Sequence, residues 1–158
     1  FNVHPSKIKI VVHRESIIHS AVEYTDNAVI AQLGLPDMKI PIQYALTYPE
    51  RIESLTGELD LTELGTLTFY KPDYDTFKCM NICREAISRG GLYPAFAHSA
   101  NEQANLMFRQ GKIGFLEIGE LVEHVMNDAP KVDTYTVDDV YDADIEARNL
   151  VIKYSGKQ

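Results

Sequence analysis

The sequence predicts an α+β fold in which a partial sheet is followed by a linker and a small carboxy-terminal four-helix bundle. Three observations carry this prediction. In the first third of the chain, short β-branched and apolar runs alternate with turn residues, a pattern typical of strands. Residues 49–73 scatter isolated leucines among Gly, Asp and Pro, as connecting segments do. From about residue 74 onward, apolar residues recur every three or four positions, which is the spacing of amphipathic helices.

The predicted sheet consists of one strand and one hairpin. Residues 7–12 place Ile or Val at every second position, which predicts a strand with one buried face. Residues 21–24 and 28–31 flank Asp26 and Asn27, whose side chains tolerate the positive φ of a tight turn, so an antiparallel hairpin is predicted. Three strands and one short helix leave a sheet face uncovered, and this part is therefore expected to need a further segment to close its core.

A short helix and a linker follow the hairpin. After Gly34 and Pro36 interrupt the strand pattern, residues 39–47 are predicted to be helical, with Pro41 in the first turn. The linker is expected to run along a surface, held by its isolated leucines, with a brief strand at residues 67–69.

The first two helices of the predicted bundle are marked by their ends. Gly90 is suited to the carboxy-terminal cap of the first. The buried stripe expected on this helix consists of Cys79, Cys83, Ala86 and Ile87. Both cysteines are interpreted as core thiols in a reducing compartment, not as a metal or redox pair. Residues 99–102, SANE, match a capping box and predict that the second helix begins at Ser99 and runs to Gly111.

The third and fourth helices are predicted from their apolar faces. The inward face of the third is expected to comprise Phe115, Ile118, Leu121, Val122, Val125 and Met126. The fourth is predicted to be a shorter helix capped by Asp144, which also lies at helical spacing from Arg148. Its expected inward residues are Ala147, Val151 and Tyr154.

Composition excludes several classes of partner. The chain carries 15 basic and 23 acidic residues, a net charge of −8 without a basic cluster, so nucleic acid is not an expected partner. Its apolar runs are far shorter than the roughly 20 residues that cross a bilayer, so no membrane partner is expected and the protein is predicted to be soluble. Because the chain opens at Phe1 without a charged and apolar leader, it is expected to be a piece of a longer protein, not a secreted one.

The segment HRESIIHS, residues 13–20, is the first candidate site. Its residue types alone favour a histidine hydrogen-bonded at the base of the hairpin. A metal hydrolase using His13, His19 and the distant Glu102 is a weaker alternative, because this histidine spacing matches no standard zinc pattern. A noncatalytic interaction or oligomerisation module is the other alternative, since an unmatched sheet edge can bind another chain.

Longer stretches of the sequence point to a family. In chain order they are HRESIIHSAVEYTDNAVIAQLGLPDMKIPIQYALTYPERI, LDL, LTFYKPDYDTF, SANE and QGKIGF. In order and spacing they resemble the carboxy-terminal part of the 1-deoxy-D-xylulose 5-phosphate reductoisomerases, over essentially the whole chain. The resemblance implies an NADPH-dependent enzyme that converts this phosphorylated sugar to 2-C-methyl-D-erythritol 4-phosphate in isoprenoid biosynthesis, with Mg²⁺ or Mn²⁺ holding substrate oxygens.

The resemblance also implies a layout and partners. Residues 1–48 would end the catalytic domain, residues 49–73 would be the linker and residues 74–158 the helical bundle. The NADPH domain would lie in an amino-terminal remainder of the same enzyme, because this chain has no G-x-G-x-x-G. The metal ligands would lie there too, because the chain lacks the acidic D-x-E metal pair of the family and its M-N-K-G-L-E helix. This chain alone would then be inactive. A homodimer is implied, in the bacterial cytoplasm or in a plastid-type organelle.

Four site residues follow from the resemblance. Ser16 and His19 match positions that bind the substrate, and His19 would be the catalytic residue, a neutral imidazole that orients a substrate hydroxyl. Pro36 and Met38 match positions beside the nicotinamide of the cofactor, where a thioether can pack on a flat ring. By spacing alone, Met38 would be the first buried residue of the helix at 39–47. No metal ligand is assigned, and His13 is expected to be structural.

Two positions depart from the family pattern. Arg14 stands where the family usually has a proline, which relaxes a rigid turn. His98 and Ser99 replace the usual Asn-Ala, and the serine is expected to strengthen the helix cap.

Overall fold

The computed structural model describes residues 3–156 and confirms the α+β fold. The chain forms two compact units. One comprises residues 10–72, and the other comprises the described residues before 10 together with those from 73 onward. Among the described helices none is long and apolar enough to cross a membrane. The three-part division predicted from the sequence, with boundaries at 48 and 73, stays a prediction.

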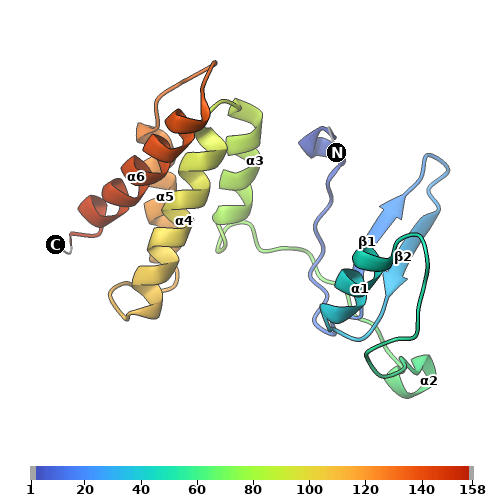
Figure 1. Cartoon of the computed structure of the whole chain (residues 1–158). Helices are drawn as coiled ribbons and strands as arrows, with labels where there is room; N and C mark the ends of the chain where they lie inside the picture. The colour runs from blue at the N-terminus through green and yellow to red at the C-terminus, as the bar shows by residue number, and fades with distance from the viewer. Residues whose placement is uncertain (1–2, 157–158) are drawn as a thin grey trace. The chain divides into compact units, whose positions relative to one another are not determined.

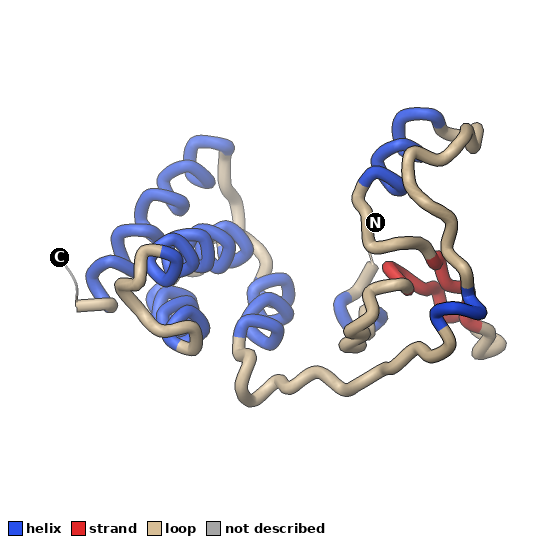
Figure 2. Tube along the Cα trace, turned by 90° about the horizontal axis from the view of Figure 1, so that it is seen from below, coloured by secondary structure: helices blue, strands red, loops and turns tan. Residues whose placement is uncertain are grey.

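The first unit is built on an antiparallel hairpin of β1 (Ile18–Glu23) and β2 (Val29–Leu33), drawn red in Figure 2. In the turn, Asn27 adopts a φ of 66° and the Asp26 carboxylate accepts a hydrogen bond of 3.0 Å from the Ala28 amide. The predicted hairpin is thereby confirmed, with strands that extend farther toward its open end. Val22 lies opposite Ile30, so the two side chains share a face.

Two short helices complete this unit. Helix α1 (Lys39–Thr47) has the predicted bounds. The Asp37 carboxylate accepts a 2.9 Å hydrogen bond from the Lys39 amide at the start of α1 and thereby acts as a cap. Helix α2 (Leu61–Leu64) lies within the predicted linker and is capped by the Asp60 carboxylate.

The strand predicted at residues 7–12 is wrong. Pro5–Lys7 form a short 3₁₀ helix, η1, and within the described chain only Val12 is paired, through an isolated bridge to Tyr70. Alternating apolar residues form a strand only where a neighbouring strand supplies backbone hydrogen bonds. Among the described residues no strand pairs with residues 7–11. Residues 67–69 also do not form the predicted strand, since the pairing begins just after them at Tyr70.

The first unit has almost no core of its own. Among the described residues from 10 to 72, only Ile17 and Gly34 are buried. Large apolar side chains on the hairpin and on α1 are open to solvent, with exposed fractions of 58% for Val22, 63% for Ile30 and 82% for Leu46. This agrees with the expectation that this part alone cannot close a core.

The second unit is the predicted four-helix bundle, coloured from green to red in Figure 1. Its helices are α3 (Cys79–Arg89), α4 (Tyr93–Arg109), α5 (Glu117–Asp128) and α6 (Val137–Tyr154). Its core contains residues from all four helices, among them Ile82, Phe96, Ala100, Ala104, Val122, Val125, Ala147 and Val151. Gly90 caps α3 as predicted, with a φ of 70° and its amide bonded to the Ala86 carbonyl.

Three details of the bundle differ from the predictions. On α3 the buried residues are Ile82 and Ala86, whereas Cys83 and Ile87 are exposed. The buried face of α3 is therefore centred on Ile82 and Ala86, next to the predicted stripe and not on it. Cys79 is half-buried, and burial raises the pKa of its thiol, so only this cysteine fits the core interpretation.

Helix α4 begins at Tyr93, not at Ser99, because Pro94 opens the first turn and the apolar spacing continues from there. Ser99 lies in mid-helix, 2% exposed, and hydrogen-bonds to the Asp144 carboxylate of α6 instead of capping anything.

Helix α6 is longer than predicted. Thr136 caps it by a capping box with Asp139, in which each side chain bonds the other residue's backbone amide. Asp144 therefore lies inside the helix, where it pairs with Arg148 at 3.0 Å as its spacing indicates. On α5 the predicted inward residues are buried except Phe115, which precedes the helix and is 54% exposed.

Candidate functional site

Two residues of the HRESIIHS segment, His13 and Glu15, contact residues 68–69, more than fifty positions later in the chain. His13 Nδ1 lies 2.8 Å from the Thr68 carbonyl oxygen, and the imidazole stacks on Phe69 with ring centroids 4.8 Å apart. The Glu15 carboxylate accepts hydrogen bonds from the Thr68 hydroxyl at 2.6 Å and from the Thr68 amide at 3.2 Å. The hydrogen bond from the Thr68 hydroxyl is the main cause that holds the pKa of Glu15 below its usual value.

The neighbouring backbone adds two further ties. Val12 and Tyr70 exchange amide and carbonyl hydrogen bonds of 3.0 and 2.9 Å. The Arg14 guanidinium lies 5.0 Å from the centroid of the Tyr70 ring. Arg14 thus contacts a residue of the same compact unit that lies more than fifty positions later in the chain.

Ile17 connects His13 to the predicted site residue His19. Its side chain is 5% exposed and its amide donates a 3.2 Å hydrogen bond to His13 Nε2. Its carbonyl oxygen accepts from the Gly34 amide at 3.0 Å and lies 3.1 Å from His19 Nδ1. One buried residue therefore connects the HRESIIHS segment, the base of the hairpin and the loop that begins at Gly34.

Ser16 and His19 lie on either side of Ile17, and both are exposed. Ser16 has a φ of 52°, a left-handed conformation that costs a non-glycine residue about 1–3 kcal/mol and persists only where neighbouring contacts enforce it. Because the Ile17 carbonyl can only accept, His19 carries its proton on Nδ1 when neutral, and Nε2 is left as an exposed acceptor. The histidine is thus hydrogen-bonded at the hairpin base, as its residue type indicated, yet still presents one ring nitrogen to solvent.

Pro36 and Met38 lie in the loop between β2 and α1, and both side chains are exposed. Met38 is 67% exposed, so the expectation from spacing that it is buried by the helix is wrong. The Gly34–Ile17 hydrogen bond holds the start of this loop at the same end of the hairpin as Ser16 and His19. An exposed thioether beside an exposed proline leaves a flat apolar ring room to pack.

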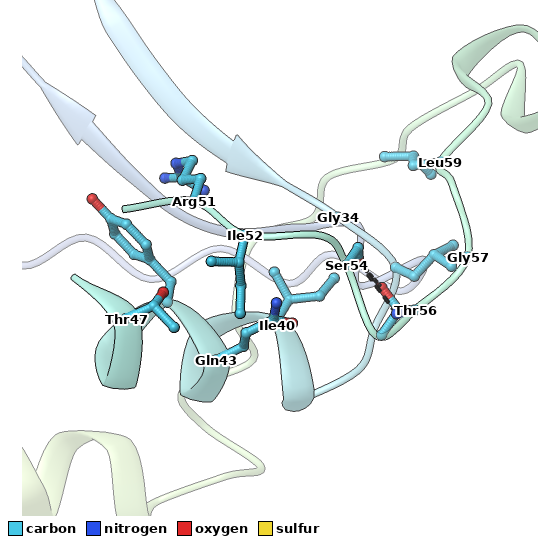
Figure 3. A pocket seen from close by; sticks show the side chains of 12 residues that line it. Gly34, Ile40, Gln43, Thr47, Arg51, Ile52, Ser54, Thr56, Gly57 and Leu59 are labelled. Atoms are coloured by element: carbon cyan, nitrogen blue, oxygen red, sulfur yellow. Dashed lines mark hydrogen bonds between the residues drawn. The ribbon is translucent and has the colours of Figure 1, made fainter. Parts of the chain in front are cut away.

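A cavity of about 290 Å³ lies between α1 and residues 51–59, and Gly34 and Leu35 of this loop also line it (Figure 3). Two of its polar side chains, Gln43 and Arg51, make contacts within the protein. The Gln43 amide donates to the Glu53 carbonyl at 2.6 Å, and the Arg51 guanidinium stacks 4.1 Å from the centroid of the Tyr44 ring. None of the four predicted site residues lines this cavity.

The described residues do not fit a metal ion. Between residues 3 and 156 no group of three or more His, Cys, Asp or Glu side chains is arranged to hold one. Both nitrogens of His13, a ligand in the metal hydrolase alternative, already have protein partners, so the described residues do not support that alternative. No step is assigned to a metal held by these residues.

The comparison with known families decides the family. A sequence profile described as the DXP reductoisomerase C-terminal domain matches residues 33–150. The chain belongs to the DXP reductoisomerase family. The resemblance drawn from the quoted motifs is thereby confirmed.

Relatives and solved structures agree. A 1-deoxy-D-xylulose 5-phosphate reductoisomerase of Nitrosomonas eutropha is 46% identical over 100% of this chain and 38% of its own length. One of Clostridium botulinum is 48% identical over 100% of this chain and 40% of its own. The reductoisomerase of Zymomonas mobilis in complex with NADPH superposes with a TM-score of 0.86 at 38% identity, covering 94% of this chain and 39% of that one. A DOX-P reductoisomerase with fosmidomycin and magnesium gives 0.84 at 34% identity, covering 92% and 39%.

The chain thus spans about two fifths of the length of the relatives that it matches. The resemblance named exposed residues of the candidate site, but the sequence did not predict the contacts of His13 with Thr68 and Phe69 or of Glu15 with Thr68. No short-range pattern marks these residues, because their partners lie more than fifty positions away. The Leu-Thr-Phe run at 67–69 is the nearest sequence signal, but its apolar pattern indicates a strand and not a contact with His13.

Proposed function

We propose that this chain is the carboxy-terminal part of an NADPH-dependent reductoisomerase that converts 1-deoxy-D-xylulose 5-phosphate to 2-C-methyl-D-erythritol 4-phosphate. Reductoisomerases similar over the whole chain support the reaction. The observation that carries the site is the geometry of His19, whose Nδ1 is bound to the Ile17 carbonyl while Nε2 is presented outward.

His19 and Ser16 are the proposed substrate contacts. The outward Nε2 of a neutral His19 accepts a hydrogen bond from a substrate hydroxyl and so orients it for rearrangement. The exposed Ser16 hydroxyl, held on a left-handed backbone, donates to an oxygen of the phosphorylated sugar. Among the described residues, neither the Ser16 hydroxyl nor His19 Nε2 has a hydrogen-bond partner, so both can contact the substrate.

Pro36 and Met38 are the proposed cofactor contacts. Their exposed side chains form an apolar surface against which the nicotinamide of NADPH packs, which excludes water from that face of the ring. NADPH supplies the hydride for the reduction. The solved complex of the Zymomonas mobilis relative with NADPH supports this cofactor.

The remaining parts of the enzyme are assigned to the segment that the relatives have and this chain does not span. That amino-terminal remainder would hold the nucleotide domain and the carboxylates that bind Mg²⁺ or Mn²⁺, and the magnesium complex of a relative supports the metal. It would also cover the apolar face of the hairpin, where Val22 and Ile30 are exposed. A homodimer that uses the free hairpin edge is proposed as the assembly. The relatives named above are bacterial, which favours the bacterial cytoplasm as the compartment.

The test uses the complete enzyme that contains this chain. Replacing His19 by Ala should lower kcat/KM for 1-deoxy-D-xylulose 5-phosphate by about 10² or more, the scale of a lost acid–base or orienting group. His124, an exposed histidine of α5 that contacts Tyr154, provides the matched control, and His124→Ala should stay close to wild type. NADPH oxidation followed by absorbance measures both. Unchanged kinetics for the His19 variant would exclude the assigned role.

A further inference from the structure

We propose that His13 is a positioning residue of this site: acting through Ile17, it fixes the backbone that presents Ser16 and His19. The inference rests on the proposed function and assigns a role to a residue that residue type alone indicated to be structural. Its basis is a continuous set of hydrogen bonds from the linker, through the His13 ring, to the candidate site.

The first step is the protonation state of the His13 ring. Nδ1 faces the Thr68 carbonyl oxygen at 2.8 Å, and a carbonyl oxygen can only accept, so Nδ1 carries a proton. Nε2 faces the Ile17 amide at 3.2 Å, and an amide N–H can only donate, so Nε2 carries none. The ring is therefore neutral and bound in one tautomer, with each nitrogen committed to a different segment of backbone.

The second step is the rigidity of the ring itself. The side chain is 6% exposed, and it stacks on Phe69 with an interplanar angle of 19°. The Glu15 carboxylate lies 3.0 Å from Nδ1 and is itself fixed by the Thr68 hydroxyl and amide. The linker at residues 68–69 thus holds the plane and the tautomer of His13.

The third step carries this rigidity to the site. His13 Nε2 accepts its hydrogen bond from the Ile17 amide, which belongs to the peptide group joining Ser16 to Ile17. This hydrogen bond therefore directly restrains the left-handed backbone of Ser16. The Ile17 carbonyl in turn receives Nδ1–H of His19 and the amide of Gly34. Displacing Ile17 moves the substrate contacts and the start of the cofactor loop together.

Two substitutions separate the bonds of the ring. Glutamine places a carbonyl oxygen near the position of Nε2 and can still accept from Ile17, whereas asparagine places an amide N–H near the position of Nδ1 and can bond only to Thr68. In the complete enzyme, His13→Asn should lower kcat/KM by about 10-fold to 100-fold, as a catalytic group displaced by about 1 Å does. His13→Gln should stay within about threefold of wild type, although both variants lose one hydrogen bond and the ring stack.

The thermal midpoints of the two variants distinguish positioning from a merely structural role, in which activity would fall only as far as stability falls. Similar midpoints together with a selective loss of kcat/KM in the asparagine variant support positioning. Equal activities in the two variants, or activities that follow the midpoints, would overturn it.

A second measurement tests the role of His13 without using activity. If the complete protein does not act on this substrate, the proposed function is refuted, but this measurement still tests the positioning role. The ¹⁵N shifts of the His19 ring report its Nδ1–H bond to the Ile17 carbonyl. They should change in His13→Asn and remain as in wild type in His13→Gln. The same spectrum should show His13 of the wild type as the neutral Nδ1–H tautomer. The proposal would be overturned if His13 were protonated on Nε2, or if the ¹⁵N shifts of the His19 ring stayed unchanged in both variants.

Discussion

Replacing Phe96 by Ala tests whether the helical unit carries its own stability. Phe96 is 1% exposed in the bundle core, and truncation of a buried phenylalanine costs about 3–5 kcal/mol. A unit built mainly on residues 73–158 has a total stability of about 4–13 kcal/mol, from roughly 0.05–0.15 kcal/mol per residue. The substitution therefore removes a large share of the free energy of unfolding.

The assay is thermal and urea unfolding of the 158-residue chain, followed by circular dichroism at a helical wavelength. For a domain of this size each kcal/mol shifts the midpoint by about 4–8 °C, so a loss of about 12 °C or more is expected. Phe115→Ala is the matched control, because this ring is 54% exposed and forms T-shaped pairs with Phe77 and Phe108. Its cost should not exceed about 1.5 kcal/mol.

Ile17→Ala extends the test to the other unit. Ile17 is the buried apolar side chain of residues 10–72, and that unit contributes little helix. The helical transition should therefore be the same as in wild type. A transition that shifts equally for the Ile17 and Phe96 variants, or that ignores Phe96, would refute the independence of the bundle.

Three further predictions concern single contacts. Met38→Ala in the complete enzyme should raise KM for NADPH more than it lowers kcat, as steady-state kinetics would show, because it removes packing on the cofactor and not a reacting group; a selective loss of kcat would contradict this. The pKa of Glu15 is lowered by the Thr68 hydroxyl, so the carboxylate stabilises the fold fully above its unfolded pKa, near the ordinary 4.5, and this contribution is lost as pH falls through the lower folded value. Glu15→Gln should therefore remove the change of the Thr68 amide signal that NMR titration shows as pH falls below about 4.5; an unchanged titration would exclude the contact. Thr136→Ala removes the cap of α6 and should cost about 1 kcal/mol in urea unfolding, whereas replacement by Ser should retain the cap.

Local patterns predicted the elements whose causes are local. The hairpin turn depends on Asp26 and Asn27 themselves, and α1 on the residues at its ends, so both were found with little error. The strand at 7–12 failed because a strand needs a partner, and the sequence of this chain does not say where the partner lies. The start of α4 failed because SANE fits a cap and an interior equally well, and the neighbouring helix decides between them through Asp144.

The candidate site shows the same limit. Family motifs identified Ser16 and His19 as site residues, a role that remains a prediction, and the structure adds that both are exposed beside a buried Ile17. What holds them in place comes from the linker, through contacts of His13 with Thr68 and of Glu15 with the same residue. Contacts across fifty positions depend on the folded path of the chain, which periodicity and capping signals do not encode.

The most direct test of the account compares NADPH oxidation by the complete enzyme and by this chain alone, each purified and supplied with 1-deoxy-D-xylulose 5-phosphate and Mg²⁺. We expect substrate-dependent oxidation by the complete enzyme and none by the 158-residue chain, although the helical unit of that chain should melt cooperatively. The described residues offer no group of side chains that could hold the metal, and the relatives are more than twice as long. Substrate-dependent oxidation of NADPH by the chain alone would contradict the assignment of cofactor and metal binding to the rest of the enzyme. A complete enzyme without this activity would contradict the proposed reaction.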